Sequence, residues 1–332
     1  MGTPLNAPVM QKTGQLPPLI RALMEPGCYG HAAGPVQLIE THISWVLLTG
    51  EYAYKIKKPV NLGFLDFSTL ALRQQACADE VRLNRRLEPE IYLGVVAISG
   101  SPEVPRLDGE GDAFEYAVKM QQFPSDATLD RLDERGGLGI EQIDQLAARL
   151  ARFHLTECPA APADSPWGEP DTIAKPVAEN FQLLFARLDD PVQRQHLTVL
   201  QDWSNAEHER LAPLMRERKH DGMVRECHGD LHLGNLAWVN GRLLIFDCIE
   251  FSAALRWIDV ISEVAFCYMD LLHRRHPDLA MRFINAWLEA SGDYAGMALL
   301  HYYSVYRAMV RAKVAALRAG QESGNDAAAS LA

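Results

Sequence analysis

The sequence is poor in the features that mark secreted, membrane-spanning and nucleic-acid-binding proteins. Its six cysteines show no Cys-x-x-Cys spacing, which argues against a disulfide framework and against a structural zinc site. It has no run of about 18 apolar residues, and its N-terminus lacks the basic-then-apolar order of a signal peptide. Its 43 acidic and 32 basic residues give a formal net charge of −11, which disfavours a phosphate backbone as partner. We therefore expect a cytoplasmic protein whose partners include neither a membrane nor a nucleic acid.

The most informative stretch of the sequence ends in a predicted hairpin. Two apolar runs, 236–239 and 242–246, are separated by Asn-Gly at 240–241, a pair that favours the positive φ angles of a type I′ turn. If residues 239 and 242 pair across that turn, Asn235 lies opposite residue 246 and beside Asp247. The sequence therefore predicts an amide and a carboxylate side by side at the open end of a rigid hairpin.

Asn235 and Asp247 would supply the oxygen ligands that Mg²⁺ prefers, and such an ion also binds phosphate oxygens. Asp230 precedes Asn235 by five residues, on the loop that enters the hairpin. A carboxylate there can reach a hydroxyl group directed at a metal-bound phosphate, and the Asp-x-x-x-x-Asn of protein kinase catalytic loops divides the roles in this way. We therefore predict that Asp230 is catalytic and that Asn235 and Asp247 bind the metal.

Two other interpretations of this stretch stay open. His228 and His232 have the i, i+4 spacing of a helical zinc pair that Asp230 would complete, although Gly229 and Gly234 disfavour a helix there. Alternatively, Asp230 only accepts hydrogen bonds from the backbone donors of a tight turn.

The first 120 residues predict a loose tail followed by a small antiparallel sheet. Residues 1–16 are aperiodic, and 18–24 predict a short helix. The apolar patterns then predict about five strands, at 36–39, 44–48, 52–57, 91–98 and 114–120, and one helix at 70–87. The Gly- and Pro-rich stretch 100–112 is predicted to be a turn.

The strand predicted at 52–57 carries two lysines on one face. Because side chains alternate along a strand, Tyr54 and Ile56 face one side while Lys55 and Lys57 face the other. A solvated strand face would explain the lysines, and so would a lysine that binds phosphate oxygens. Glu80, in the middle of the predicted helix, would then hold Lys55 in place, unless it is only surface charge beside neighbouring arginines.

The remainder of the chain predicts helices and an α+β protein with two lobes. The helical patterns cover 140–154, 176–188, 192–218, 257–272, 279–291 and 295–318. We predict an N-lobe at 1–120, a connector at 121–124, a larger helical C-lobe at 125–320 and a flexible tail at 321–332.

The chain resembles the aminoglycoside phosphotransferase-like family of the protein-kinase-like fold, over roughly residues 37–318. The resemblance rests on His-Gly-Asp-x-x-x-x-Asn at 228–235, on the downstream Asp247, and on Lys55 with Glu80. Tyr-Lys-Ile-Lys-Lys-Pro at 54–59 followed by Gly-Phe-Leu-Asp-Phe is similar to a bacterial subgroup that is often fused to a C-terminal P-loop ATP-binding domain. No P-loop motif occurs in this sequence, which predicts that this second domain is absent or was cut away. In related chains, the resemblance implies a P-loop domain or protein as a partner.

The resemblance also implies a bilobal fold, with a small antiparallel sheet in the N-lobe and a helical C-lobe, and assigns roles to single residues. Asp230 would be the general base, Asn235 and Asp247 the Mg²⁺ ligands, and Lys55 the lysine on the ATP phosphates, positioned by Glu80. The remaining residues expected at the nucleotide are Ala53 at the adenine, Ser44 in the phosphate-covering loop, and Gln121, Gln122 and Phe123 in the connector.

We therefore predict a phosphotransferase that moves the γ-phosphoryl group of Mg-ATP to a hydroxyl group of a small molecule. The lack of an Ala-Pro-Glu activation segment disfavours the alternative of a protein kinase. A second alternative is an ATP-binding regulatory module without turnover.

Three residues are tentative acceptor contacts. Glu250 stands third after Asp247, where much of the family has an acid in second place. Arg307 and Arg311 lie one turn apart on the last predicted helix and would bind an anionic acceptor, unless they belong to solvated helix surface.

Overall fold

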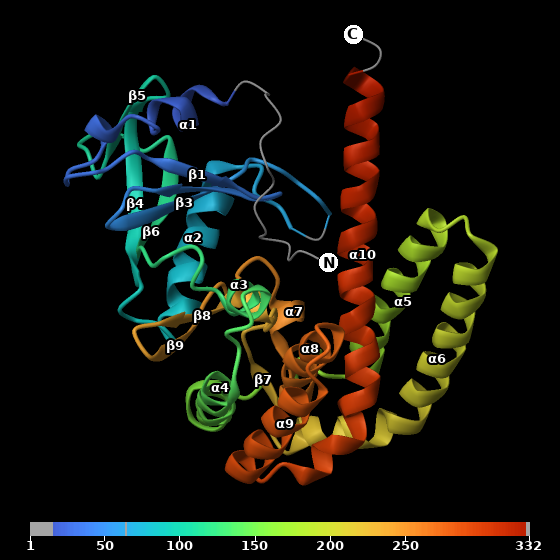
Figure 1. Ribbon diagram of the computed structural model, residues 1–332. Helices are drawn as coiled ribbons and strands as arrows, with labels where there is room; N and C mark the ends of the chain where they lie inside the picture. The colour runs from blue at the N-terminus through green and yellow to red at the C-terminus, as the bar shows by residue number, and fades with distance from the viewer. Residues whose placement is uncertain (1–15, 64, 330–332) are drawn as a thin grey trace. The chain divides into compact units, whose positions relative to one another are not determined.

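The structure is a computed structural model that describes residues 16–63 and 65–329, with the backbone alone for 318–329 (Figure 1). The tail predicted at 1–16 therefore lies almost wholly outside the described residues. The chain divides into two compact units. Among the described residues, the sheet unit comprises 16–136 and Gly234–Ala253, and the helical unit comprises Gly137–Leu233 and 254–329.

The sheet unit is built on a six-stranded antiparallel sheet with the strand order β1-β2-β3-β6-β4-β5. Its strands are β1 (Gln37–Glu40), β2 (Ser44–Leu48), β3 (Tyr52–Lys57), β4 (Tyr92–Ser101), β5 (Val104–Leu107) and β6 (Glu115–Gln121). The sequence predicted about five strands and a turn over 100–112. This prediction is wrong for Val104–Leu107, which form the sixth strand, β5. Because β5 lies at the edge of the sheet and pairs with β4 alone, it tolerates Pro105, which donates no hydrogen bond.

Apolar side chains cover both faces of this sheet. One face holds Tyr54 and Ile56 of β3 and packs against α1 (Pro18–Ala22) and η1 (Pro26–Cys28). The other face packs against α2 (Leu70–Asn84), which begins where the Thr69 hydroxyl accepts a hydrogen bond from the Leu72 N–H. The predicted alternation along β3 is confirmed, and it directs Lys55 and Lys57 to the face that carries α2.

The predicted hairpin is confirmed and belongs to the sheet unit. It consists of β8 (Leu236–Val239) and β9 (Arg242–Ile245), with Val239 paired to Arg242. Asn240 and Gly241 have φ angles of 51° and 76°, as a type I′ turn requires. The short helix α3 (Leu129–Glu134) packs beside β8.

The helical unit contains the remaining long helices, as the sequence predicted. They are α4 (Ile140–Arg152), α5 (Pro170–Arg187), α6 (Pro191–His220), α8 (Val260–His273), α9 (Pro277–Ser291) and α10 (Met297–Ala329). The apolar stripe of α4, which includes Ile143, Leu146 and Leu150, is fully buried. Helix α8 packs against α9 and α10, and α4 packs against α9 (Figure 1). No described helix is long and apolar enough to cross a membrane.

Short elements join these helices. They are the π-helical turn η2 (Phe153–Glu157), the paired strands β7 (Val224–Glu226) and β10 (Trp257–Asp259), η3 (Leu233–Asn235), α7 (Ala253–Arg256) and η4 (Tyr294–Gly296). Three differences from the predicted helix bounds are clear. Helix α8 begins at Val260 and not near residue 257, because Trp257–Asp259 pair with β7 as strand β10. Helix α5 begins at Pro170, within a predicted loop, because proline is well suited to the first turn of a helix. Helix α10 continues to Ala329, through residues predicted as a flexible tail, where alanines of high helix propensity recur.

Candidate active site

Lys55 lies between two carboxylates in the sheet unit. Its Nζ donates to Glu80 Oε1 at 2.9 Å and to Asp247 Oδ1 at 2.5 Å. Lys55 lies on strand β3 and Glu80 on helix α2, and Asp247 lies two residues after the end of β9. The contact between Lys55 and Glu80, which the sequence suggested, is therefore present, and the solvated strand face is excluded because Lys55 is only 6% exposed.

A second lysine extends this arrangement. Lys57 Nζ donates to Glu80 Oε2 and to Glu250 Oε1, so each oxygen of Glu80 receives one lysine. Lys57 and Glu80 are fully buried, and Glu250 is nearly so. The five side chains form a continuous chain of ion pairs, Asp247–Lys55–Glu80–Lys57–Glu250, that begins and ends on the same short segment. We call it the lysine–carboxylate chain.

The charges of the lysine–carboxylate chain explain its protonation. Burial alone would lower the pKa of Lys55, but Asp247 and Glu80 raise it well above its ordinary value. Burial would likewise raise the pKa of Glu80, but Lys55 and Lys57 lower it to about 2. Burial raises the pKa of Glu250 in spite of Lys57, and the charge of Glu80 adds to that rise. With two lysines against three carboxylates, the chain can take up one further positive charge.

Backbone hydrogen bonds fix the segment that carries Asp247. The Phe246 N–H donates to the Asn235 carbonyl at 3.1 Å, which confirms the predicted pairing across the open end of the hairpin. The Asp247 N–H donates to the Tyr92 hydroxyl at 3.0 Å, and the Cys248 N–H donates to Asn84 Oδ1 at 2.9 Å. Asp247 itself has a φ of 69°, a left-handed conformation that Asp tolerates better than most residues. The Tyr92 and Asn84 contacts were not predicted, because both residues lie far away along the chain.

The donor set at this end of the hairpin fits Mg²⁺. Asn235 offers an amide oxygen and Asp247 a carboxylate, and both side chains are more than nine-tenths buried. These are hard oxygen ligands, and only two protein ligands leave coordination positions for phosphate oxygens and water. The surplus negative charge of the lysine–carboxylate chain, which includes Asp247, favours a cation in the same place.

The residues predicted at the nucleotide also belong to the sheet unit. Ala53 is buried in β3, and Gln121 ends β6. Gln122 ties the connector to the turn before β3, since its N–H donates to the Glu51 carbonyl and its Oε1 accepts from the Gly50 N–H. The ring of Phe123 packs against the ring of Phe246, with centroids 5.1 Å apart. The connector and the hairpin are thereby coupled through an aromatic contact.

Ser44, predicted in a phosphate-covering loop, is the first residue of β2 and is fully buried. Its N–H donates to Thr41 Oγ1 at 2.9 Å. Its hydroxyl has no hydrogen-bond partner among the residues that the structure describes. A contact between this hydroxyl and a phosphate stays a prediction.

Asp230 belongs to the helical unit and lies between two histidines. Its N–H donates to His228 Nδ1 at 3.2 Å, and its Oδ2 lies 3.5 Å from His232 Nε2. Burial would raise the pKa of Asp230, but His232, His228 and Arg311 together lower it to about 2. The carboxylate is therefore ionised at neutral pH. The zinc interpretation finds no support here, because the one grouping of potential metal ligands in the described part of the chain lies elsewhere, at His154, Cys227 and Glu263.

The tentative acceptor residues are placed differently from what the sequence suggested. Glu250 is buried against Lys57, as described above. Arg307 is only 3% exposed, and its Nε and Nη1 donate to the carbonyls of Ser262 and Gly229. Solvated helix surface is therefore wrong for Arg307, because its neighbours on α8 enclose it. Arg311 is partly exposed, with Nη2 3.7 Å from Asp270 Oδ1. An acceptor contact at Arg311 stays a prediction.

Known proteins resemble this chain in sequence. A model of the phosphotransferase enzyme family matches residues 106–300. Uncharacterized proteins of Mycobacterium bovis and of two strains of Mycobacterium tuberculosis are 32% identical over 287 residues, which covers 86% of this chain and 56% of each relative. The chain thus spans about half the length of the curated relatives it matches.

Two solved structures are similar to this chain at low identity. A choline/ethanolamine kinase family protein from Mesorhizobium loti is 11% identical with a TM-score of 0.49, over 93% of this chain and 86% of that one. A choline kinase from Cryptosporidium parvum Iowa II is 12% identical with a TM-score of 0.49, over 93% of this chain and 95% of that one.

Proposed function

The chain belongs to the phosphotransferase enzyme family, and we propose that it transfers the γ-phosphoryl group of ATP to a hydroxyl group of a small molecule. The observation that carries the proposal is the fixed position of Lys55 between Glu80 and Asp247. A lysine held by one carboxylate, next to a second carboxylate that suits a metal, is the arrangement that phosphoryl transfer from a nucleotide uses.

The proposed reaction needs few groups because phosphoryl transfer is catalysed mainly by positioning and by charge. Lys55 would bind phosphate oxygens of ATP, and Glu80 would keep its ammonium group in place. Asn235 and Asp247 would hold Mg²⁺, which supplies positive charge to the phosphate oxygens when it is bound. The connector at Gln121, Gln122 and Phe123 would lie along the adenine, with Ala53 beside it.

Asp230 would accept the proton of the acceptor hydroxyl. The hydroxyl oxygen then forms a bond to the γ-phosphorus while the bond from that phosphorus to the bridging oxygen of ADP breaks. The proton ends on the Asp230 carboxylate, and ADP carries away the electron pair of the broken bond. With its pKa lowered to about 2, Asp230 is a weak base, so its main contribution would be to orient the hydroxyl as the charge develops.

Two substitutions separate these roles and test the proposal. We expect Asp247→Ala to abolish Mg²⁺-dependent ATP binding, measured by calorimetry, because the variant lacks a metal ligand. We expect Asp230→Asn to leave the Kd for ATP nearly unchanged but to remove transfer, measured as phosphorylated product from a panel of sugars, amino alcohols and nucleosides. Asp164→Asn, at an exposed loop position of the helical unit, is the matched control.

The outcomes distinguish the alternatives. A wild-type protein that binds Mg-ATP but phosphorylates no member of the panel and hydrolyses no ATP is a regulatory module. Transfer to a peptide substrate in preference to every small hydroxyl compound would make it a protein kinase. Equal loss of ATP binding in Asp230→Asn and Asp247→Ala would refute the division of roles.

A further inference from the structure

Both backbone polar groups of Gly229, the residue directly before Asp230, are hydrogen-bonded to charged side chains. Its N–H donates to Glu263 Oε1 at 2.7 Å, and its carbonyl accepts from Arg307 Nη1 at 3.0 Å. Glu263 comes from α8 and Arg307 from α10. Hydrogen bonds to ionised groups are about twice as strong as neutral ones, so two of them on one residue fix its orientation firmly.

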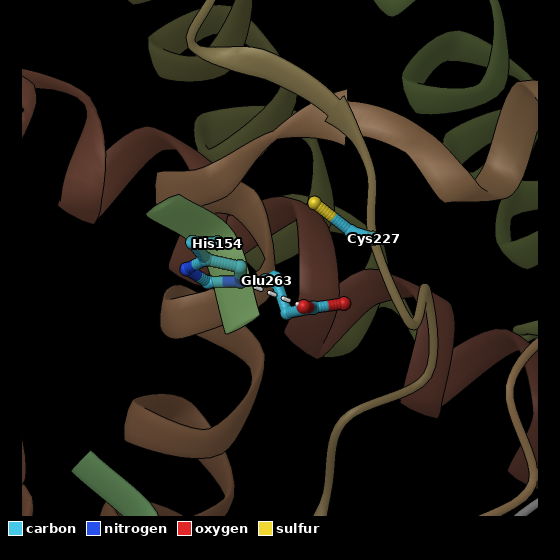
Figure 2. A group of neighbouring side chains, drawn as sticks. All are labelled: His154, Cys227 and Glu263. Carbon is cyan, nitrogen blue, oxygen red and sulfur yellow. Dashed lines mark hydrogen bonds and ion pairs between the residues drawn. The ribbon is translucent and has the colours of Figure 1, made fainter. Parts of the chain in front are cut away.

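Each of the two side chains is itself held by further contacts. Glu263 Oε2 lies 2.8 Å from Nε2 of His154 in η2. Figure 2 marks this contact with a dashed line. Arg307 Nε donates to the Ser262 carbonyl at 3.1 Å, and the guanidinium lies over the ring of Phe266 at 5.1 Å. The loop before Asp230 is therefore tied to three separate helical elements of the helical unit.

Burying these charged side chains costs free energy of folding. Glu263 is 1% exposed, His154 2% and Arg307 3%. Moving an ion out of water costs several kcal/mol after relaxation, and hydrogen bonds to neutral main-chain carbonyls offset only part of that cost for Arg307. Arg307 contacts no carboxylate among its described hydrogen-bond partners, which are both main-chain carbonyls. A stable core alone would be served better by apolar side chains at such a position.

Gly229 has an unusual backbone conformation directly before Asp230. It has a φ of 91°, in a region that other L-residues rarely adopt. An uncommon backbone conformation of this kind is kept when surrounding contacts fix it. Here the side chains of Glu263 and Arg307 fix it through hydrogen bonds to the N–H and the carbonyl of Gly229. The peptide group between Gly229 and Asp230 carries the carbonyl that Arg307 holds, so this contact acts directly on the backbone of Asp230.

We propose that Glu263 and Arg307 are positioning residues that clamp the two peptide groups on either side of the Gly229 Cα and thereby orient Asp230, with His154 holding the other carboxylate oxygen of Glu263. The inference rests on the proposed function, because it assigns the clamp a role in the transfer step. None of the three side chains touches the reacting groups in this scheme.

A metal ion is the competing use of part of this cluster. His154, Cys227 and Glu263 offer ligand atoms within 4.8 Å of one another (Figure 2). However, the 2.8 Å between His154 Nε2 and Glu263 Oε2 is a hydrogen-bond distance, whereas two ligands of a tetrahedral zinc ion lie roughly 3.3 Å apart. Glu263 Oε1 is already bound to the Gly229 N–H.

The clamp is tested with paired substitutions of graded severity. Arg307→Leu and Glu263→Leu remove a contact to Gly229, whereas Arg307→Lys keeps a charge and Glu263→Gln keeps an acceptor oxygen. Lys219→Met is the matched control, since Lys219 is a buried cation of the same unit that donates to Ser165 and Glu169 instead. The measurements are kcat, the KM for ATP, and amide hydrogen exchange of the peptide 227–233 by mass spectrometry.

We expect each leucine variant to lower kcat by roughly a hundredfold, as misplacement of a catalytic group by about 1 Å does. The KM for ATP should stay within twofold, and exchange of 227–233 should accelerate. Glu263→Gln should recover much of the kcat that Glu263→Leu loses. Lys219→Met should change neither kcat nor this exchange, even if it lowers the melting temperature.

Several results would overturn the inference. Exchange of 227–233 that is unchanged in the leucine variants would refute the clamp, whether or not any acceptor has been found. A kcat within twofold of wild type in those variants would refute its role in transfer. If the leucine variants do not fold, the same criteria apply to Arg307→Met, which is close to arginine in length but donates no hydrogen bond to the Gly229 carbonyl. One equivalent of zinc in the purified protein, lost in Cys227→Ala, would replace the clamp by a metal site. A wild-type protein without transfer would refute the proposed function, and the exchange experiment would still decide on the clamp.

Discussion

Lys57 differs from the next residue, Lys58, in how completely the protein encloses its charge. Lys57 is fully buried between Glu80 and Glu250, whereas Lys58 pairs with Glu40 at 2.6 Å with both side chains partly exposed. Removing one member of a buried pair leaves the other charge without compensation, at a cost of about 3–5 kcal/mol. A partly exposed pair contributes about 0–1 kcal/mol because water and salt screen it.

We therefore expect Lys57→Met to lower the free energy of unfolding by about 3–5 kcal/mol and Lys58→Met by less than about 1 kcal/mol, both measured in urea. The double variant Lys57→Met/Glu250→Gln should cost less than the sum of its single changes, because the carboxylate left unpaired is gone. Additive costs would show that Lys57 and Glu250 do not interact. A small cost for Lys57→Met would show that water reaches this pair.

His154 gives the helical unit a dependence on pH. Burial would lower the pKa of His154, but Cys227 and Glu263 raise it to about 9. The groups that face it are the Cys227 thiol, whose own pKa is well above its ordinary value, the Glu263 carboxylate, whose pKa is lowered, and the ring of Trp287. In the range between pH 6 and 9, His154 is therefore the member of this group that titrates.

The direction of this pH dependence follows from the pKa of His154 in the folded protein and in the unfolded chain. Its pKa is about 9 in the folded protein and near 6.5 in the unfolded chain, so the folded state binds the proton more tightly. The stabilisation is fully present below about pH 6.5 and is lost as the pH rises through about 9, at roughly 1.4 kcal/mol per pKa unit. We expect urea unfolding at pH 6 and pH 9.5 to show this fall, and His154→Gln to lack it. An identical pH dependence in both proteins would contradict the assignment to His154.

Single-residue prediction succeeded where a local pattern carried the information. Strand alternation placed Lys55 and Lys57 on one face, and the mid-helix position of Glu80 suggested a partner for Lys55. The partner of Lys57 was not predicted, because Glu250 lies 193 residues further along the chain and its burial depends on tertiary packing. The same holds for Arg307, whose place in a helical stripe does not show that α8 will enclose it.

At the scale of elements, the hairpin of β8 and β9 is the most strongly specified part of the site. Its two central residues have positive φ angles, and its register sets Asn235 across from the residue before Asp247. A Cβ atom added at Gly241 would meet no atom within 4 Å. A substitution there is therefore expected to destabilise the protein through the positive φ angle of this residue and not through contacts of the new Cβ atom with neighbouring atoms.

We expect Gly241→Val to lower the free energy of unfolding by about 1–3 kcal/mol, because a β-branched residue strongly disfavours a φ of 76°. Asn240→Gly keeps the turn and should be nearly neutral. Calorimetry should also show weaker Mg-ATP binding for Gly241→Val at a temperature where it is fully folded, since the hairpin orients both proposed metal ligands. Weaker binding by Asn240→Gly instead would mean that the turn acts on the site in some other way.

Helices and strands were predicted correctly where the sequence shows a clear apolar period or a capping residue at the helix start. Strands β1 to β3 and helices α2, α4 and α6 lie within a few residues of their predicted bounds. Strand β5 was missed because edge strands tolerate the proline and glycine that otherwise signal a turn. The π-helical turn η2 was missed because it continues the apolar pattern of α4 and differs only in its hydrogen bonding.

At the scale of the molecule, the α+β class and the change from sheet to helices were predicted correctly. The change in apolar period from two to 3.6 is a local property of the sequence. The division of the chain into two units does not follow from local patterns. Gly234–Ala253 belongs to the sheet unit, although it was predicted within the helical segment 125–320. Its ties to that unit run through Tyr92, Asn84 and Lys55, which no spacing in the sequence connects to it.

This grouping sets an order of events during synthesis on the ribosome. The first 136 residues contain Lys55, Lys57 and Glu80, but Asp247 and Glu250 have not yet been made when they emerge. Two ammonium groups would then share one carboxylate in the interior, which leaves a surplus positive charge there. At 5–20 residues per second, roughly ten seconds pass before the missing segment appears. The nascent sheet unit therefore remains incomplete over that interval, and the segment directly after β9, which carries Asp247 and Glu250, completes its charge balance.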